Sequence, residues 1–345
     1  MANPILVEVT RGGIVESRHR GVVAVSLASG ELVLAIGDVA GPIFPRSSVK
    51  PMQVLAAITA GAIERFGFGD KEIAVMCASH NGEAPHLDAV RSVLEKIGAG
   101  EEHLECGAHW PRHAETARAL ARGGSGALAI HNNCSGKHAG MLALARLMDV
   151  EPAGYVAPDH PVQLRIRSVL EQFFAISLAS APCGTDGCSV PTYAVAPAAL
   201  ALGFARFATG EGLAGALAGA AKRVAAAIAA EPFMVAGSER FCTEAMRSTG
   251  ARALVKVGAE GVMCAGLPGR GLGIAIKCDD GATRGAEVIM AQLLAAFGAA
   301  DPDEPGFARL MTRQILNAND IHVGDIRAAE ALGDAISRNA AAMIA

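Results

Sequence analysis

Residues 46–50 have the sequence Arg46-Ser47-Ser48-Val49-Lys50, and they lead into an apolar run that ends at Ile58. If a helix begins here, Ser47 and Lys50, three residues apart, lie on one face of it. A hydroxyl is a weak nucleophile until a base removes its proton, and an amine whose pKa is lowered by burial or a cationic neighbour is such a base. Ser47 and Lys50 therefore form a candidate acyl-transfer pair. The same spacing is also typical of a helix cap beside a solvated lysine.

Short β-rich runs stand at both ends of the chain and enclose a mostly helical middle. They cover residues 5–9, 22–27 and 32–36, and then residues 253–257, 262–265 and 272–277. Residues 73–78 fit either a buried strand or a buried helix. No linker, repeat or low-complexity segment divides the chain. We therefore expect an α/β (α+β) fold in a single domain over residues 1–345, with a loosely ordered tail after about residue 330.

The composition is that of a soluble globular protein, with 345 residues, 51% hydrophobic content and a net charge of −4. This charge gives no reason to expect a nucleic acid or an anionic membrane as a partner. The N-terminus shows no signal-peptide pattern, and Lys222 and Arg223 interrupt the longest Ala-rich stretch too early for a membrane span. We expect a cytoplasmic protein, in which the eight cysteines are thiols or metal ligands rather than disulfides.

Two further residues extend the candidate chemistry beyond Ser47 and Lys50. Ser79 ends an apolar run and begins a turn with the sequence Ser-His-Asn-Gly, where a side chain can face a cleft. Lys256 lies in a strand-like run directly before Gly258. Taken singly, these residues are typical of a turn former and of a solvent-facing lysine. Their order along the chain, an early Ser-x-x-Lys, a second serine and a late strand lysine, is the informative feature.

Cysteine and basic residues form a candidate metal site. Cys134 shares a helical face with Lys137 or His138, and Cys188 comes from a later loop that also holds Asp186. Zinc favours thiolate and imidazole ligands, so composition alone favours Cys134, His138 and Cys188. The alternative is that these cysteines are ordinary buried thiols.

Six segments in fixed order resemble one known family. They are Arg46-Ser-Ser-Val-Lys-Pro, Cys77-Ala-Ser-His-Asn-Gly-Glu, His131-Asn-Asn-Cys-Ser-Gly-Lys-His, Cys183-Gly-Thr-Asp-Gly-Cys, Gly237-Ser-Glu-Arg-Phe and Lys256-Val-Gly-Ala-Glu-Gly. Over about residues 5–325 the chain is similar to the class 3, or Rhizobium-type thermolabile, L-asparaginases. The resemblance implies a fold like that of serine β-lactamases and penicillin-binding proteins, with an antiparallel sheet built from the N-terminal and C-terminal strands.

The resemblance also implies an activity and a catalytic set. The activity is hydrolysis of L-asparagine to L-aspartate and ammonia. The catalytic set is two Ser–Lys tandems, Ser47 with Lys50 and Ser79 with Lys256. In this scheme Ser47 is the nucleophile and Lys50 is its base, while Ser79 and Lys256 pass protons toward the leaving ammonia and help to keep Lys50 neutral.

Zinc and substrate ligands follow from the same resemblance. Cys134, Lys137 and Cys188 would hold Zn²⁺ in a positioning role rather than as the source of the nucleophile, which replaces His138 by Lys137. His138 becomes a substrate-binding residue, together with Arg46 and Asp186. A homodimer is implied as well. The segment after Arg240 departs from the pattern, since Cys242 and Glu244 stand where more polar, Asp/Thr-like residues are expected.

Three alternatives stay open at this point. A zinc-bound water could be the nucleophile in place of Ser47. The fold could be a non-catalytic sensor similar to penicillin-binding proteins. Glutamine, one methylene longer, could be the preferred substrate, because a pocket discriminates on that scale by only about 1–3 kcal/mol.

Overall fold

The computed structural model describes the backbone of residues 2–344 and the side chains of residues 2–339. The chain divides into two compact units, each assembled from separate stretches of sequence. The sheet unit comprises Met1–Ser48, Val195–Gly212 and Glu244–Ala345, and the helical unit comprises Val49–Ala194 and Leu213–Thr243.

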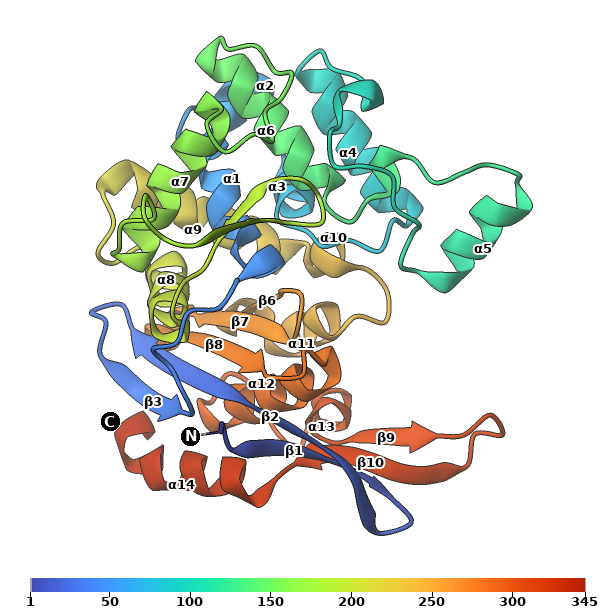
Figure 1. The fold of residues 1–345 in the computed structure, drawn as a ribbon, viewed down its shortest axis with the longest axis vertical. Coiled ribbons are helices and arrows are strands. Elements are labelled where there is room, and N and C mark those ends of the chain that lie inside the picture. The colour runs from blue at the N-terminus through green and yellow to red at the C-terminus, as the bar shows by residue number, and fades with distance from the viewer. Residues whose placement is uncertain (1, 345) are drawn as a thin grey trace. The chain divides into compact units, whose positions relative to one another are not determined.

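An eight-stranded antiparallel sheet is the centre of the sheet unit (Figure 1). The strand order is β6-β7-β8-β2-β1-β10-β9, and β3 also pairs with β2. The strands are β1 (Ile5–Arg11), β2 (Ile14–Leu27), β3 (Leu32–Ile36), β6 (Leu254–Val257), β7 (Val262–Leu267), β8 (Leu272–Cys278), β9 (Arg313–Leu316) and β10 (His322–Ala328). Because β2 pairs with β8 and β1 with β10, strands from the two ends of the chain form one sheet. This confirms the expected antiparallel sheet from N-terminal and C-terminal strands.

Some strands of this sheet do not coincide with a continuous apolar run in the sequence. The strand β2 begins at Ile14 rather than at the expected residue 22, and β9 and β10 were not expected at all. The first part of β2 alternates exposed and partly covered residues and is rich in charge, and β9 is mostly exposed. A strand with one solvated face carries no continuous hydrophobic signal, and this explains why these pieces were missed.

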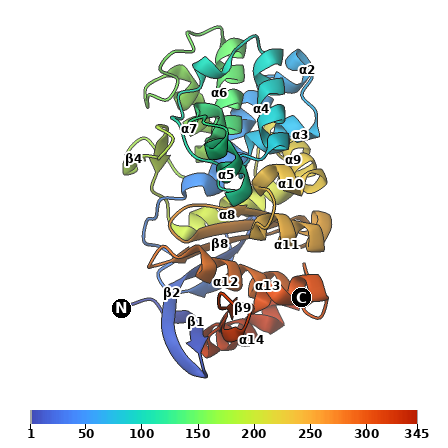
Figure 2. The same cartoon turned by 90° about the vertical axis from the view of Figure 1, so that its right-hand side faces the viewer.

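Helices cover the sheet within this unit. Among them, α8 (Pro197–Thr209) packs on β8, β2 and β7, while α12 (Thr283–Ala296) packs on β7, β8, β1 and β10. Figures 1 and 2 show α8 and α12 on opposite sides of the strands. The remaining helices are α13 (Pro305–Met311) and α14 (Glu330–Ile344), and α14 lies beside β1 and β3. The burial of Leu332 and Ala335 anchors the first turns of α14.

The helical unit is built around α1 (Lys50–Ile58), all nine residues of which are buried. Helices α6 (Ser135–Met148), α7 (Pro161–Phe174) and α9 (Gly215–Ala230) pack against it. The other elements are α2 (Ala62–Phe66), α3 (Asp70–Met76), α4 (Ala84–Lys96), α5 (Ala114–Arg122), α10 (Pro232–Ala236) and the hairpin β4 (Cys183–Thr185) to β5 (Pro191–Tyr193). A further helix, α11 (Phe241–Thr249), begins in this unit and ends in the sheet unit.

A close contact between α6 and the end of α3 places the candidate site. The ambiguous residues 73–78 prove to be the last turns of α3 and the start of the loop that follows. A side chain at Gly136 would collide with the carbonyl of Val75, so glycine lets the two backbones approach. The start of α6 is thereby held beside the loop that follows α3. No helix in the described part of the chain is long and apolar enough to span a bilayer.

Candidate active site

Lys50, the first residue of α1, has its amine inside the helical unit, and the side chain is fully buried. Its Nζ donates hydrogen bonds to the carbonyls of Ala78 at 2.6 Å and Asn133 at 3.4 Å, and lies 3.1 Å from Ser79 Oγ. Burial lowers the pKa of Lys50 below its ordinary value. The arrangement is a buried amine in direct contact with a serine hydroxyl, which is the chemistry a proton-transfer pair requires.

The loop that carries Ser79 is tied to the start of α6 by the next residue. The amide N–H of His80 donates to the carbonyl of Asn133 at 3.3 Å, and its Nε2 lies 2.9 Å from Ser135 Oγ. Because the amide of Gly82 donates to His80 Nδ1, the ring proton is on Nε2 and points to Ser135. Burial, and then nearby positive charges, lower the pKa of His80 well below its usual range. The ring is therefore neutral and links the Ser79 loop to the start of α6 through its hydrogen bonds.

Cys134, Lys137 and Cys188 meet in the same buried region of the helical unit. Lys137 Nζ lies 3.0 Å from Cys188 Sγ, and the two thiols are hydrogen-bonded to each other. The hydrogen bond from Cys188, followed by the charges of Lys50 and Lys137, holds the pKa of Cys134 well below its usual range in spite of burial. Burial lowers the pKa of Lys137, but the charges of the two sulfurs outweigh it and the net shift is upward.

These three residues fit a zinc ion chemically. Two sulfurs and one amine nitrogen converge from α6 and from the loop between β4 and β5, and zinc accepts both kinds of donor. In the described part of the chain no three His, Cys, Asp or Glu side chains gather as a metal site. A zinc ion held here therefore needs Lys137, whose amine must lose its proton to bind.

His138, the next residue on α6, is fully buried and presents one ring nitrogen without a partner. The hydroxyl of Tyr155 lies 2.7 Å from His138 Nδ1 and accepts the backbone N–H of Glu105 at 2.9 Å. The hydroxyl proton is therefore donated to Nδ1, which places the ring proton on Nε2. Within the described residues His138 Nε2 has no hydrogen-bond acceptor. Burial lowers the pKa of His138 well below its usual range, so the ring is neutral.

Asp186 lies in the turn between β4 and β5, two residues before Cys188. Its amide N–H donates to the carbonyl of Val190 at 2.9 Å, and its carboxylate accepts the N–H of Gly187 at 2.7 Å. The negative charge of Asp186 raises the pKa of Lys137. Asp186 is half-buried.

In the sheet unit, Arg46, Ser47 and Ser48 belong to a 3-10 turn, η1 (Arg46–Val49). Arg46 has a φ of 53°, a left-handed conformation that costs energy for a residue other than glycine and is often found at functional sites. Ser48 is fully buried and donates to the carbonyl of Pro45 at 2.8 Å, whereas Ser47 is half-buried. Of the two serines, Ser47 is the one with access to solvent.

Lys256 is buried in β6 of the sheet unit, and its Nζ donates to the carbonyl of Val257 at 2.7 Å. It pairs directly with Cys264 on β7. The thiol of Cys264 is hydrogen-bonded to Ser48, so the 3-10 turn with Ser47 lies next to the strand pair that carries Lys256. Burial raises the pKa of Cys264 to about 12, so this thiol is not a nucleophile.

The predicted site residues fall into two groups. Arg46, Ser47 and Lys256 lie in the sheet unit, and the other predicted residues, Lys50, Ser79, Cys134, Lys137, His138, Asp186 and Cys188, lie in the helical unit. Sequence reasoning missed His80, Asn133 and Ser135 as partners, although all three stand inside the motif segments. It also missed Tyr155, which no motif or spacing indicates.

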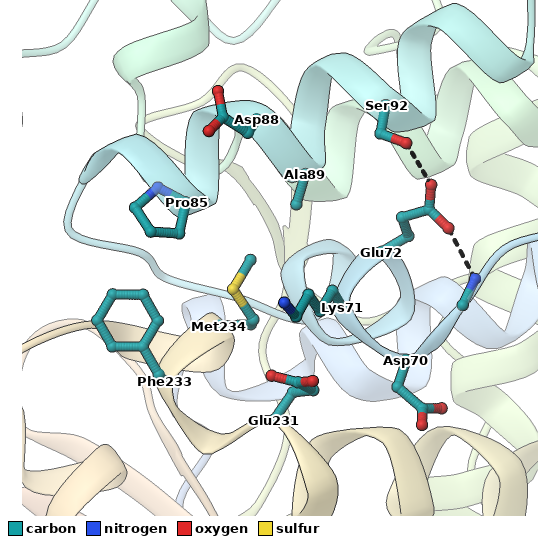
Figure 3. Close-up of a pocket in the computed structure, with 11 residues that line it drawn as sticks. Asp70, Lys71, Glu72, Pro85, Asp88, Ala89, Ser92, Glu231, Phe233 and Met234 are labelled. Atoms are coloured by element: carbon teal, nitrogen blue, oxygen red, sulfur yellow. Dashed lines mark hydrogen bonds between the residues drawn. The ribbon is translucent and has the colours of Figure 1, made fainter.

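A separate hollow of about 710 Å³ lies between α3, α4 and α10 (Figure 3). Its lining includes Glu72, Asp88, Phe233 and Met234, and none of the predicted site residues. The ring of Phe233 stacks on His86 at 4.7 Å between centroids. This hollow is therefore distinct from the Lys50–Ser79 region.

A buried amine in contact with a serine hydroxyl can exchange a proton with it. The sequence matches the family described as L-asparaginase II over residues 7–328. The chain belongs to the L-asparaginase II family, which makes it an amidohydrolase and implies a small-molecule amide substrate. The resemblance drawn from the six motif segments is thereby confirmed at the level of the family.

Solved structures provide a second comparison. The chain is similar to Mglu, with 15% identity and a TM-score of 0.38, over 82% of this chain and 68% of that one. For Mglu in its tris and glutamate form the identity is 16% and the TM-score 0.38, over 87% of this chain and 64% of that one. For a β-lactamase from Mycobacterium bovis the identity is 14% and the TM-score 0.40, over 80% and 94%. The chain thus spans about two thirds of the length of Mglu. Among curated proteins, the search found no match.

Proposed function

We propose that this protein is an L-asparaginase, which hydrolyses the side-chain amide of L-asparagine to L-aspartate and ammonia. Membership of the L-asparaginase II family supports the amide substrate. The observation that carries the proposal is the contact of the Lys50 amine with Ser79 Oγ at 3.1 Å, in a site where burial lowers the pKa of the amine. A lowered pKa increases the neutral fraction of the amine, and the neutral amine can accept a proton from a hydroxyl group.

Ser47 is the nucleophile in this proposal. Lys50, three residues later, removes the proton of the Ser47 hydroxyl, and the oxygen attacks the side-chain amide carbon of asparagine. The C–N bond then breaks, leaving an ester on Ser47 and releasing ammonia. Ser48 is unsuited to this role because it is buried and its hydroxyl is bonded to Pro45.

Ser79 completes the proton path. Its hydroxyl contacts the Lys50 amine, so the proton taken from Ser47 can pass through Ser79 to the departing nitrogen. Lys256 forms the second tandem with Ser79, as the family resemblance implies. Water then attacks the ester and returns the site to its starting state.

The polar ends of the substrate need ligands of their own. Arg46 and Asp186 are proposed to bind the α-carboxylate and α-ammonium groups. The Nε2–H of His138 is a buried donor with no protein acceptor among the described residues, and it would donate to an oxygen of the substrate. A donor left unsatisfied in the interior is costly, so a ligand that accepts from it gains binding energy.

Cys134, Lys137 and Cys188 are proposed to hold zinc. When bound, the ion would have a positioning role, in which it neutralises the thiolates and holds this part of the site rigid. The residues themselves link the start of α6 to the loop between β4 and β5 and thereby position Asp186 and His138. A homodimer and a cytoplasmic location are proposed on the family resemblance alone, and size-exclusion chromatography with light scattering tests the first.

Replacement of one serine tests the central claim. Ser47→Ala should abolish ammonia release from asparagine while circular dichroism shows an unchanged fold, and Ser48→Ala is the matched control that stays active. Full activity of Ser47→Ala would refute the proposal. Assay of glutamine alongside asparagine defines the substrate, and binding of asparagine without hydrolysis would indicate a sensor. Turnover by verified zinc-free protein excludes zinc-bound water as the nucleophile.

A further inference from the structure

The segment Gly237–Arg240, between α10 and α11, lies against the loop that follows Ser79. Gly237 has a φ of 113°, and a side chain there would collide with Glu83 and with Asn81 Nδ2. The amide of Ser238 donates to Glu83 Oε2 at 3.0 Å, and Asn81 Nδ2 donates to the carbonyl of Ser238 at 2.9 Å. The two loops are therefore joined by two hydrogen bonds, each between the backbone of Ser238 and a side chain of the Ser79 loop.

Arg240 ends this segment and contacts the Ser79 loop with one nitrogen. Its Nη1 donates to Asn81 Oδ1 at 2.8 Å and to the carbonyl of Ser79 at 3.4 Å. The amide of Asn81 is thus held from both sides, by Arg240 and by Ser238. Among the described residues the Nε and Nη2 groups of Arg240 have no acceptor, although the side chain is half-buried. The Nε–Nη2 edge is one that binds carboxylates through two parallel hydrogen bonds.

A second guanidinium lies near the first. The amide of Arg112 donates to the carbonyl of Asn81 at 2.9 Å, which anchors Arg112 to the same loop. Desolvation and then the positive charge of Arg240 lower the pKa of Arg112. Within the described residues neither guanidinium has a carboxylate at ion-pair distance, and the nearby Glu83 is bonded to Ser238 instead. Two adjacent positive charges without a counter-ion favour an anionic ligand.

We propose that the Nε–Nη2 edge of Arg240, supported by Arg112, binds the α-carboxylate of the amino-acid substrate beside Ser79, while Nη1 holds the Ser79–Asn81 loop in place. This inference rests on the proposed asparaginase function and gives the Gly237–Arg240 motif a role in substrate recognition. It adds Arg240 to Arg46 as a ligand of the α-carboxylate and leaves the α-ammonium to Asp186. Lysine cannot replace arginine here, because an ammonium lacks the planar fork.

The test compares two substrates that differ only in the carboxylate. L-Asparagine and 3-aminopropanamide share the amine and the reacting amide, but the second lacks the α-carboxylate. Arg240→Lys should lower kcat/KM for asparagine by about 10- to 100-fold, mainly through KM, the range expected for lost hydrogen bonds to a charged group. For 3-aminopropanamide, kcat/KM should change by less than about 3-fold. Arg118→Lys on the exposed face of α5 is the matched control and should change neither.

The outcomes separate a binding role from a purely structural one. An equal loss for both substrates would mean that Arg240 only supports the Ser79 loop, and the carboxylate contact would be refuted. If Arg240→Lys does not fold, Arg112→Gln should still lower kcat/KM for asparagine selectively by a few-fold, and no selective effect would refute the proposal.

A binding measurement separates this inference from the proposed function. Calorimetry with L-aspartate and with β-alanine, which lacks the α-carboxylate, needs no hydrolysis. Wild-type protein that prefers aspartate, with the preference lost in Arg240→Lys, supports the inference even if no ammonia is released from asparagine, in which case only the proposed hydrolysis fails. An unchanged preference in Arg240→Lys overturns the inference, whether or not the protein hydrolyses asparagine.

Discussion

The hydroxyl of Tyr155 lies 2.7 Å from Nδ1 of His138, and this single contact decides which nitrogen of the histidine carries the proton. Since the Tyr155 oxygen already accepts the amide of Glu105, its own proton must go to the ring. His138 is thereby a donor at Nε2 and is not available as a base. Seventeen residues separate the two side chains in sequence, and nothing in the motif around His138 indicates the contact.

Removal of the Tyr155 hydroxyl should change the tautomer of His138 while the fold persists. Tyr155→Phe leaves His138 Nδ1 and the amide of Glu105 without a partner, at a cost of about 1–3 kcal/mol in the free energy of unfolding. The ¹⁵N shifts of the His138 ring should then report a mixed tautomer population. Tyr193→Phe is the matched control, with the His138 signals unchanged. An unaltered Nε2–H tautomer in Tyr155→Phe would contradict the assignment.

Ser79→Ala should reduce kcat for ammonia release by about 10²- to 10⁴-fold, the contribution typical of a positioned proton-transfer group. Lys50 retains its two backbone carbonyl partners in this variant, so the fold should persist. The exposed Ser168 provides the control, since Ser168→Ala removes a hydroxyl of the same kind from α7. Activity within about 3-fold of wild type for Ser79→Ala would remove Ser79 from the proton path.

The pH profile should reflect Lys50. Its neutral form is the base, so kcat/KM should rise with pH as the amine loses its proton, and the midpoint of that rise should lie below 10.5 because burial lowers the pKa. Replacement of Lys50 by methionine should remove the rise together with the activity. A profile that continues to rise past pH 10.5 would show that the amine is not depressed.

Metal analysis distinguishes the two ligand sets considered for zinc. Lys137→Met should lose bound zinc, as should Cys134→Ala, because each removes one of three protein ligands. His138→Asn should keep one zinc per chain, since Nδ1 of His138 is occupied by Tyr155 and Nε2 is protonated. Zinc content is read by plasma mass spectrometry after dialysis. The reverse pattern, with zinc lost only in His138→Asn, would restore the set favoured by composition.

Stability should depend on Glu72, at the edge of the hollow between α3, α4 and α10. Burial raises the pKa of this carboxyl, but hydrogen bonds from Lys96, Ser92 and the amide of Gly69 outweigh it and lower the pKa overall. A carboxyl with a lowered pKa stabilises the folded state above about pH 4.5. This stabilisation is lost as pH falls through the pKa that Glu72 has in the folded state.

Glu72→Gln should therefore cost about 1–3 kcal/mol at pH 7 and progressively less in acid. Urea unfolding at a series of pH values measures this. Glu115→Gln removes an exposed ion pair with Arg118 and should have almost no effect. A penalty for Glu72→Gln that does not change with pH would show that the carboxylate charge is not its cause.

Much of the architecture was predictable from local pattern. The inner strands β7 and β8 were expected within a few residues, because each carries a continuous apolar stretch. At the start of α6 the N-cap residue is Cys134, and Asn132 Oδ1 accepts the amide of Cys134. Side-chain geometry, rather than residue type, decides such a cap.

Several features could be recognised from the amino-acid order alone: the Ser-x-x-Lys at Ser47, the second serine, the cysteine pair and the strands at both ends. Those features depend on periodicity and on chemistry within a few residues, which a linear pattern contains. Only the tertiary structure decided that the Lys50 amine reaches Ser79, and that Cys188 meets Lys137 from 51 residues away. It also decided the depressed pKa of Lys50, because burial depends on what the rest of the chain packs around the amine.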